Sequence, residues 1–71
     1  MTKHQVKALE KLRDHVMAGM KERREIAARQ FRKCKDQENW FGCAIMEARI
    51  EHIQIELNEL DRHFSDIIRG K

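Results

Sequence analysis

The sequence contains no proline, only three glycines in 71 residues, and no long run of apolar residues. A β-sandwich or barrel needs a turn about every 8–12 residues, and glycine and proline are common in such turns. No apolar run reaches the roughly 18 residues of a membrane-spanning helix, and the first residues, MTKHQVK, do not form a secretion signal. We therefore expect an all-α, cytoplasmic protein that does not enter a membrane.

Reactive side chains are also scarce. The two cysteines, Cys34 and Cys43, are too few for a disulfide scaffold and lack the four-ligand pattern of a structural zinc site. The chain has no glycine-rich phosphate loop and no nucleophile elbow, and its only aliphatic hydroxyls, Thr2 and Ser65, lie near the two ends. We expect neither an enzyme nor a cofactor-binding protein.

Charge divides the chain into two halves. Charged residues make up 38% of the sequence, compared with about 25% in an average protein. Residues 1–35 hold eleven Lys and Arg against four acids, a net charge of +7, whereas residues 36–71 hold four against eight, a net charge of −4. The overall charge of +3 therefore conceals a basic half and an acidic half.

Apolar residues follow helical spacing in both halves. In the second half, steps of 4, 3, 4, 3, 4 and 3 residues connect Met46, Ile50, Ile53, Leu57, Leu60, Phe64 and Ile67. This heptad pattern predicts a helix with a packed seam. A looser stripe in the first half, with Arg23 in its gap, consists of Leu9, Leu12, Val16, Met20, Ala27, Phe31 and Cys34.

The two helical patterns are separated by a short polar segment. Residues 36–39 read Asp-Gln-Glu-Asn, and Asp36 or Asn39 is suited to cap the following helix. We predict one domain over residues 1–71, with helices at about 3–35 and 39–69. Because the helices are of similar length and the connection is short, we expect an antiparallel two-helix hairpin.

A simple register supports the hairpin. When positions that sum to 76 or 77 are placed opposite each other, each stripe residue of the first helix meets one on the second, for example Met20 with Leu57 and Leu12 with Phe64. Cys34 meets Cys43 near the turn, where we expect buried thiols and keep a disulfide as the alternative. The basic and acidic flanks are also expected to pair across the hairpin.

The same folding brings a histidine pair together. His15 comes near His63, with Asp14 and Asp61 beside them. Two imidazoles and two carboxylates are able to hold a transition metal. The pattern lacks the i, i+4 ligand pair typical of a helical metal site, so we interpret these histidines as solvated side chains.

A second apolar face remains after the seam is assigned. It consists of Phe41, Ala44, Ile45, Ala48 and Ile55. A chain of this size seldom builds a sufficient core alone, and a helix that is apolar on two sides is usually buried on two sides. We therefore expect a homo-oligomer, preferably a dimer that forms a four-helix bundle or else a larger oligomer, and a contact with another protein through the same face.

Cations and an aromatic ring gather at the turn. They are Arg32, Lys33, Lys35 and Trp40, a combination that nucleotide and RNA sites use. The sequence therefore supports two functional hypotheses. The first is a non-enzymatic interaction or regulatory module that acts through self-association and partner binding, and the alternative is a nucleotide or nucleic-acid binder.

Overall fold

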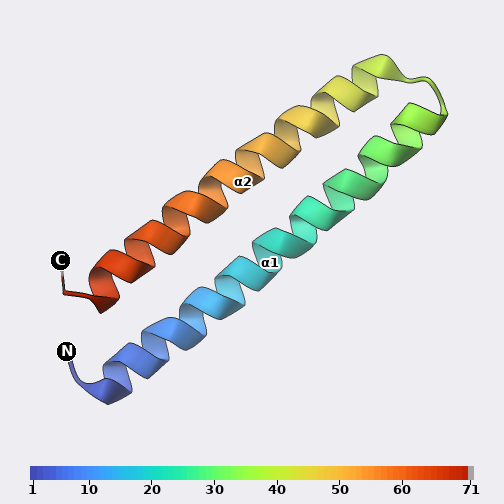
Figure 1. Cartoon of the computed structure of the whole chain (residues 1–71). Coiled ribbons are helices and arrows are strands. Elements are labelled where there is room, and N and C mark those ends of the chain that lie inside the picture. The colour runs from blue at the N-terminus through green and yellow to red at the C-terminus, as the bar shows by residue number, and fades with distance from the viewer. Residues whose placement is uncertain (71) are drawn as a thin grey trace.

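The protein is a hairpin of two antiparallel helices, α1 and α2, which lie side by side along their length (Figure 1). The computed structural model describes residues 1–70. Helix α1 spans Lys3–Asp36 with 34 residues, and α2 spans Trp40–Ile68 with 29 residues. Both termini lie at the end opposite the turn, and the Cα atoms extend over 53 × 18 × 8 Å. The expected all-α architecture of two packed helices is confirmed.

Local hydrogen bonds define where α1 begins and ends. Thr2 caps its start: the Thr2 hydroxyl accepts from the Gln5 backbone N–H at 3.2 Å, and the Gln5 side chain accepts from the Thr2 N–H at 3.0 Å. This reciprocal capping box satisfies two donors that would otherwise lack partners. Lys33 and Lys35 occupy the last turn, where positive charge is favourable beside the exposed carbonyl groups.

The turn is tight and reverses the chain within three residues. Glu38 has a φ of 55°, in the left-handed region, and the Asn39 N–H donates to the Cys34 carbonyl at 2.8 Å. The Asn39 side chain then accepts from the Gly42 N–H at 3.0 Å and caps α2. Of the two residues expected to cap α2, Asn39 is its N-cap, whereas Asp36 is the last residue of α1.

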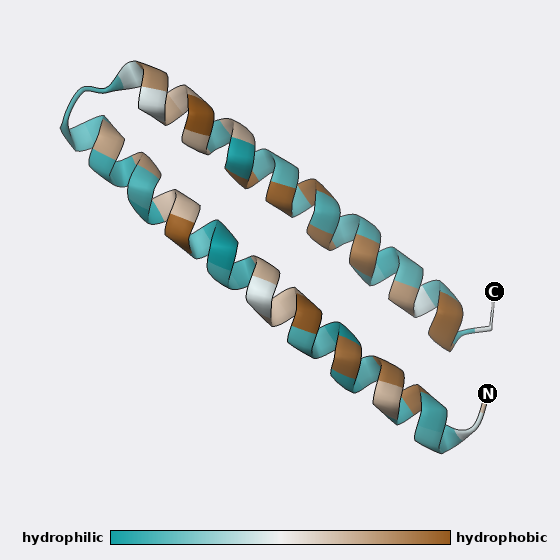
Figure 2. Cartoon of the chain, turned by 180° about the vertical axis from the view of Figure 1, so that it is seen from behind, coloured by the Kyte–Doolittle hydropathy of each residue, from teal (hydrophilic) through white to brown (hydrophobic). Residues whose placement is uncertain are grey.

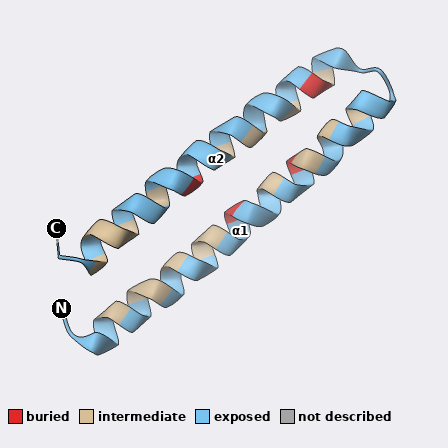
Figure 3. Ribbon diagram, in the orientation of Figure 1, coloured by how far each residue is buried: buried red, intermediate tan, exposed pale blue. Residues whose placement is uncertain are grey.

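The core is a single seam between the helices. Its buried members are Met20 and Ala27 of α1 and Cys43 and Leu57 of α2. The buried parts of the two ribbons lie on the edges that face each other (Figure 3). Most of the remaining heptad residues of α2 are half-buried beside them, namely Met46, Ile50, Ile53, Leu60 and Phe64. At the open end the prediction is wrong by one residue, since Ile67 is exposed and Ile68 is half-buried.

Two positions of the α1 stripe also differ from the prediction. Leu12 is 51% exposed while the neighbouring Arg13 is half-buried, and Arg23 is exposed while Arg24 is half-buried. The residues facing α2 thus run through Val16, Met20 and Arg24 in two consecutive four-residue steps, a stutter in the heptad pattern. Arginine fits such positions because its aliphatic stem packs while its guanidinium reaches water.

The expected charge pairing between the helices is not present in residues 1–70. Both salt bridges there lie within one helix: Arg13 Nε to Asp14 Oδ1 at 3.2 Å, and His52 Nε2 to Glu56 Oε1 at 2.6 Å. The hydrogen bond between side chains that crosses the hairpin joins a charged and a neutral group, since Arg24 donates to the side-chain carbonyl of Gln54 at 2.5 Å. Because exposed ion pairs contribute only about 0–1 kcal/mol, the apolar seam dominates the packing.

Candidate interaction surfaces

The outer face of α2, which we define as Phe41, Ala44, Ile45, Ala48 and Ile55, points away from α1. Phe41, Ala48 and Ile55 are seven residues apart and share one side, and Ile55 lies about 200° around the helix from the buried Leu57. All five residues are exposed, Phe41 to 79% and Ile55 to 56%. Figure 2 shows that hydrophobic residues are distributed along both helices.

A shallow depression adjoins this face. Its lining comes from Ile45, Ala48, Arg49, His52 and Ile53. Three of these residues are apolar, Arg49 and His52 are polar, and the His52 Nε2 atom contacts Glu56 Oε1. An apolar strip with charged edges has the form that receives the apolar side of an amphipathic helix.

The turn end presents its basic residues in different directions. Arg32, Lys33, Lys35 and Trp40 are all exposed, with Trp40 at 63% as the first residue of α2. Lys33 lies about 200° around α1 from Lys35, so the two ammonium groups leave the helix on opposite sides. The structure therefore brings the four residues to one end of the hairpin but not onto one surface.

The two thiols are close to the turn and are free. Cys43 is buried in the seam, where its thiol donates to the Phe31 carbonyl at 3.9 Å, and Cys34 is half-buried. Burial raises the pKa of the Cys43 thiol above its ordinary value of 9.0; the neighbouring Cys34 and Glu47 act in the same direction and Lys35 opposes them. Cys43 is therefore a core thiol that resists ionisation.

This raised pKa predicts how stability depends on pH. The unfolded chain loses the Cys43 proton near its ordinary pKa of 9.0, whereas the folded chain holds that proton to higher pH. The stability that the folded chain gains by keeping the Cys43 thiol neutral is thus fully present below pH 9, and it is lost as the pH rises through the pKa of the folded chain. We expect the urea midpoint to fall more steeply above pH 9 for the native chain than for Cys43→Ala. Parallel curves for the two proteins would contradict this prediction.

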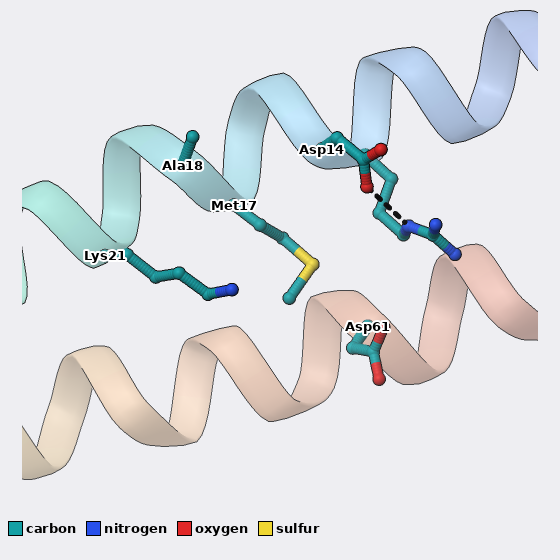
Figure 4. Close-up of a pocket in the computed structure, with 6 residues that line it drawn as sticks. Asp14, Met17, Ala18, Lys21 and Asp61 are labelled. Carbon is teal, nitrogen blue, oxygen red and sulfur yellow. Dashed lines mark hydrogen bonds and ion pairs between the residues drawn. The ribbon is translucent and has the colours of Figure 1, made fainter.

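A polar groove lies on one side of the hairpin (Figure 4). Met17 points between the helices, with Lys21 and Asp14 on α1 and Asp61 on α2 around it. Asp14 is bound to Arg13, which also lines the groove. His15 and His63 are exposed, and in the part of the chain that the structure describes no three potential metal ligands gather.

The structure exposes two apolar residues of α1 that the sequence does not predict to be exposed. Ile26 is exposed, as is Leu12, which the stripe had placed in the seam. The available signal was a seven-residue repeat through Leu12, Gly19 and Ile26, adjacent to the seam positions. Gly19 interrupts the apolar character of this repeat, so the spacing alone does not indicate a face.

Comparison of the chain with protein-family models, curated proteins and solved structures finds no match. Among residues 1–70, neither helix is long and apolar enough to cross a membrane.

Proposed function

We propose that this protein is a non-enzymatic interaction module that binds another protein through the outer face of α2. The observation that carries the proposal is the exposure of Phe41, Ile45 and Ile55 on the side of α2 that α1 does not cover. Soluble proteins rarely expose large contiguous apolar patches, and such patches mark protein–protein interaction sites.

The charge of α2 indicates the chemistry of the partner. Between Trp40 and Ile68 the helix carries six acids against two arginines. An amphipathic helix with Lys and Arg beside its apolar stripe would bury its apolar side on the outer face. Its cations would meet acids such as Glu51 and Glu59, and such complementarity steers association and selects partners.

A photo-crosslinking experiment tests this function. Phe41 is replaced by benzoylphenylalanine, and the protein is irradiated in its native cells, with the same probe at Arg29 as the matched control. Arg29 is exposed on α1, about 180° from the buried Met20. We expect an adduct with a different protein at position 41 and none at position 29, and we expect Ile55→Glu to abolish the adduct.

Two outcomes would overturn the proposal. If position 41 crosslinks only to copies of this chain, the outer face is a self-association surface. If equal adducts form at positions 41 and 29, the face confers no specificity.

The exposed Trp40 favours nucleic-acid binding as a second candidate function. It is the only tryptophan, its ring is exposed and accessible for stacking, and Arg32 and Lys35 lie at the same end of the hairpin. Titration with a single-stranded RNA should quench the tryptophan fluorescence, more weakly at high salt and in Lys35→Glu. Unchanged fluorescence at low salt would exclude this candidate.

A further inference from the structure

A third apolar surface runs along one side of the hairpin. We call it the lateral face and define it by two seven-residue repeats: Leu12, Gly19 and Ile26 on α1, and Ile53, Leu60 and Ile67 on α2. At about 100° per residue, the α1 repeat lies 140–200° from Lys21, and the α2 repeat lies 140–200° from Asn58. Lys21 lines the polar groove and Asn58 extends the Arg24–Gln54 bond, so the lateral face is the side opposite these polar groups.

The two repeats are level with each other. The bond between Arg24 and Gln54 joins positions that sum to 78. Leu12 with Ile67, Gly19 with Leu60, and Ile26 with Ile53 each sum to 79, which is within one residue of that register. They form three layers across the hairpin. Leu12, Ile26 and Ile67 are exposed, and a Cβ built on Gly19 would have no neighbour within 4 Å, so that side is open.

The hairpin exposes more surface than a compact monomer of its mass. Its accessible area is 5807 Å², whereas a folded monomer of 8.5 kDa is expected to expose about 4,650 Å². The excess of about 1,150 Å² exceeds the roughly 800 Å² that each partner buries in a standard interface. Burying one long side against a second copy would therefore reduce the exposed area of each chain toward the value expected for a compact protein of this mass.

Charge selects the relative orientation of two such copies. If the two-fold axis is perpendicular to the helices, the basic α1 faces the basic α1 of the second copy. If the axis is parallel to the helices, α1 of each copy faces the acidic α2 of the other at the same level. Arg23 and Glu56 lie on the lateral face and also sum to 79, so the parallel axis places Arg23 opposite Glu56 of the second copy.

We propose that two copies of this chain pair through their lateral faces, with the two-fold axis parallel to the helices. The product is a four-helix bundle in which each α1 packs between the α2 helices of both copies and all turns lie at one end. In the hairpin itself, the salt bridges among residues 1–70 leave the opposite charges of α1 and α2 unpaired with each other. Phe41, Ala44, Ala48 and Ile55 of the outer face remain outside this bundle, whereas Ile53 belongs both to the lateral face and to the depression beside the outer face. The proposed assembly therefore leaves most of the outer face free for the proposed partner.

Molecular mass in solution tests the interface. Sedimentation equilibrium of the native chain should give twice 8.5 kDa. Leu12→Glu changes a residue that is exposed in the hairpin and should give the monomer mass with unchanged helical circular dichroism. Ile55→Glu, the matched variant on the outer face, should remain a dimer. A monomeric native chain, or dissociation by Ile55→Glu and not by Leu12→Glu, would overturn the proposal.

A charge swap tests the orientation. Arg23→Glu places two acids opposite each other at both symmetric contacts and should weaken dimerisation by about tenfold or more. Adding Glu56→Arg to that variant should restore the native dimer, whereas Arg29→Glu, on the far side of α1, should have little effect. Failure of the double variant to recover would exclude the parallel axis, because the perpendicular arrangement does not bring Arg23 to Glu56.

Discussion

Leu57→Ala should lower the free energy of unfolding by about 3 kcal/mol. Leu57 is the least exposed of the four core residues, at 3%, and lies midway along α2 opposite Met20. Truncation removes apolar contacts and leaves a cavity, because two helices joined at one end cannot close over a gap in the middle of the seam. A chain of this size has a total stability of about 4–10 kcal/mol, so the loss is a large fraction of the whole.

Ile55→Ala is the matched control for that measurement. It removes a similar volume two residues away, but from a side chain that is 56% exposed. We expect a change within about 0.5 kcal/mol for this variant, as for most surface substitutions. Urea unfolding of both variants at one protein concentration, followed by helical circular dichroism, would show the difference. Equal losses would mean that the seam does not carry the stability of the hairpin.

Gly42→Ala should destabilise the hairpin by about 1–2 kcal/mol, although alanine is the better helix former. A Cβ at this position would lie 2.8 Å from Cys34 Sγ and 2.8 Å from Asn39 Nδ2. Either the thiol must leave its position in the seam or the Asn39 cap must shift, and loss of such a cap alone costs about 1 kcal/mol. Glycine is thus required here by the close approach of α1 and the turn.

A double-mutant cycle separates these two causes. Cys34→Ala removes the sulfur atom and makes room beside position 42, so Gly42→Ala should cost less in the Cys34→Ala background than in the native chain. Thermal unfolding of the four proteins provides the comparison. An identical cost in both backgrounds would show that the strain falls entirely on the Asn39 cap.

Much of the helical seam is predictable from the sequence because heptad spacing is a property of one helix. Residues such as Ile50, Leu57 and Phe64 repeat without interruption, so their common side is determined locally. The outer face of α2 is predictable for the same reason. Its place outside the seam follows from the register of the two helices, in which the uninterrupted heptads of α2, and not Phe41 and Ile55, match the apolar stripe of α1.

The stutter in α1 was not predictable from spacing. Leucine is expected in a seam more often than arginine, and yet Arg13 faces α2 while Leu12 does not. Further along the same helix, Arg24 faces α2 while Arg23 does not. Which residue faces the partner helix depends on the angle at which two rods meet over their whole length.

The amino-acid sequence by itself determined the helices, the place of the turn and the separation of charge into a basic and an acidic half, because capping, spacing and net charge are local properties. Tertiary structure alone decided which arginines enter the seam, that opposite charges remain apart within the hairpin, and that Leu12 and Ile26 lie on an open side. These features depend on how α1 and α2 are rotated relative to each other, and that rotation is fixed only when the two helices pack together.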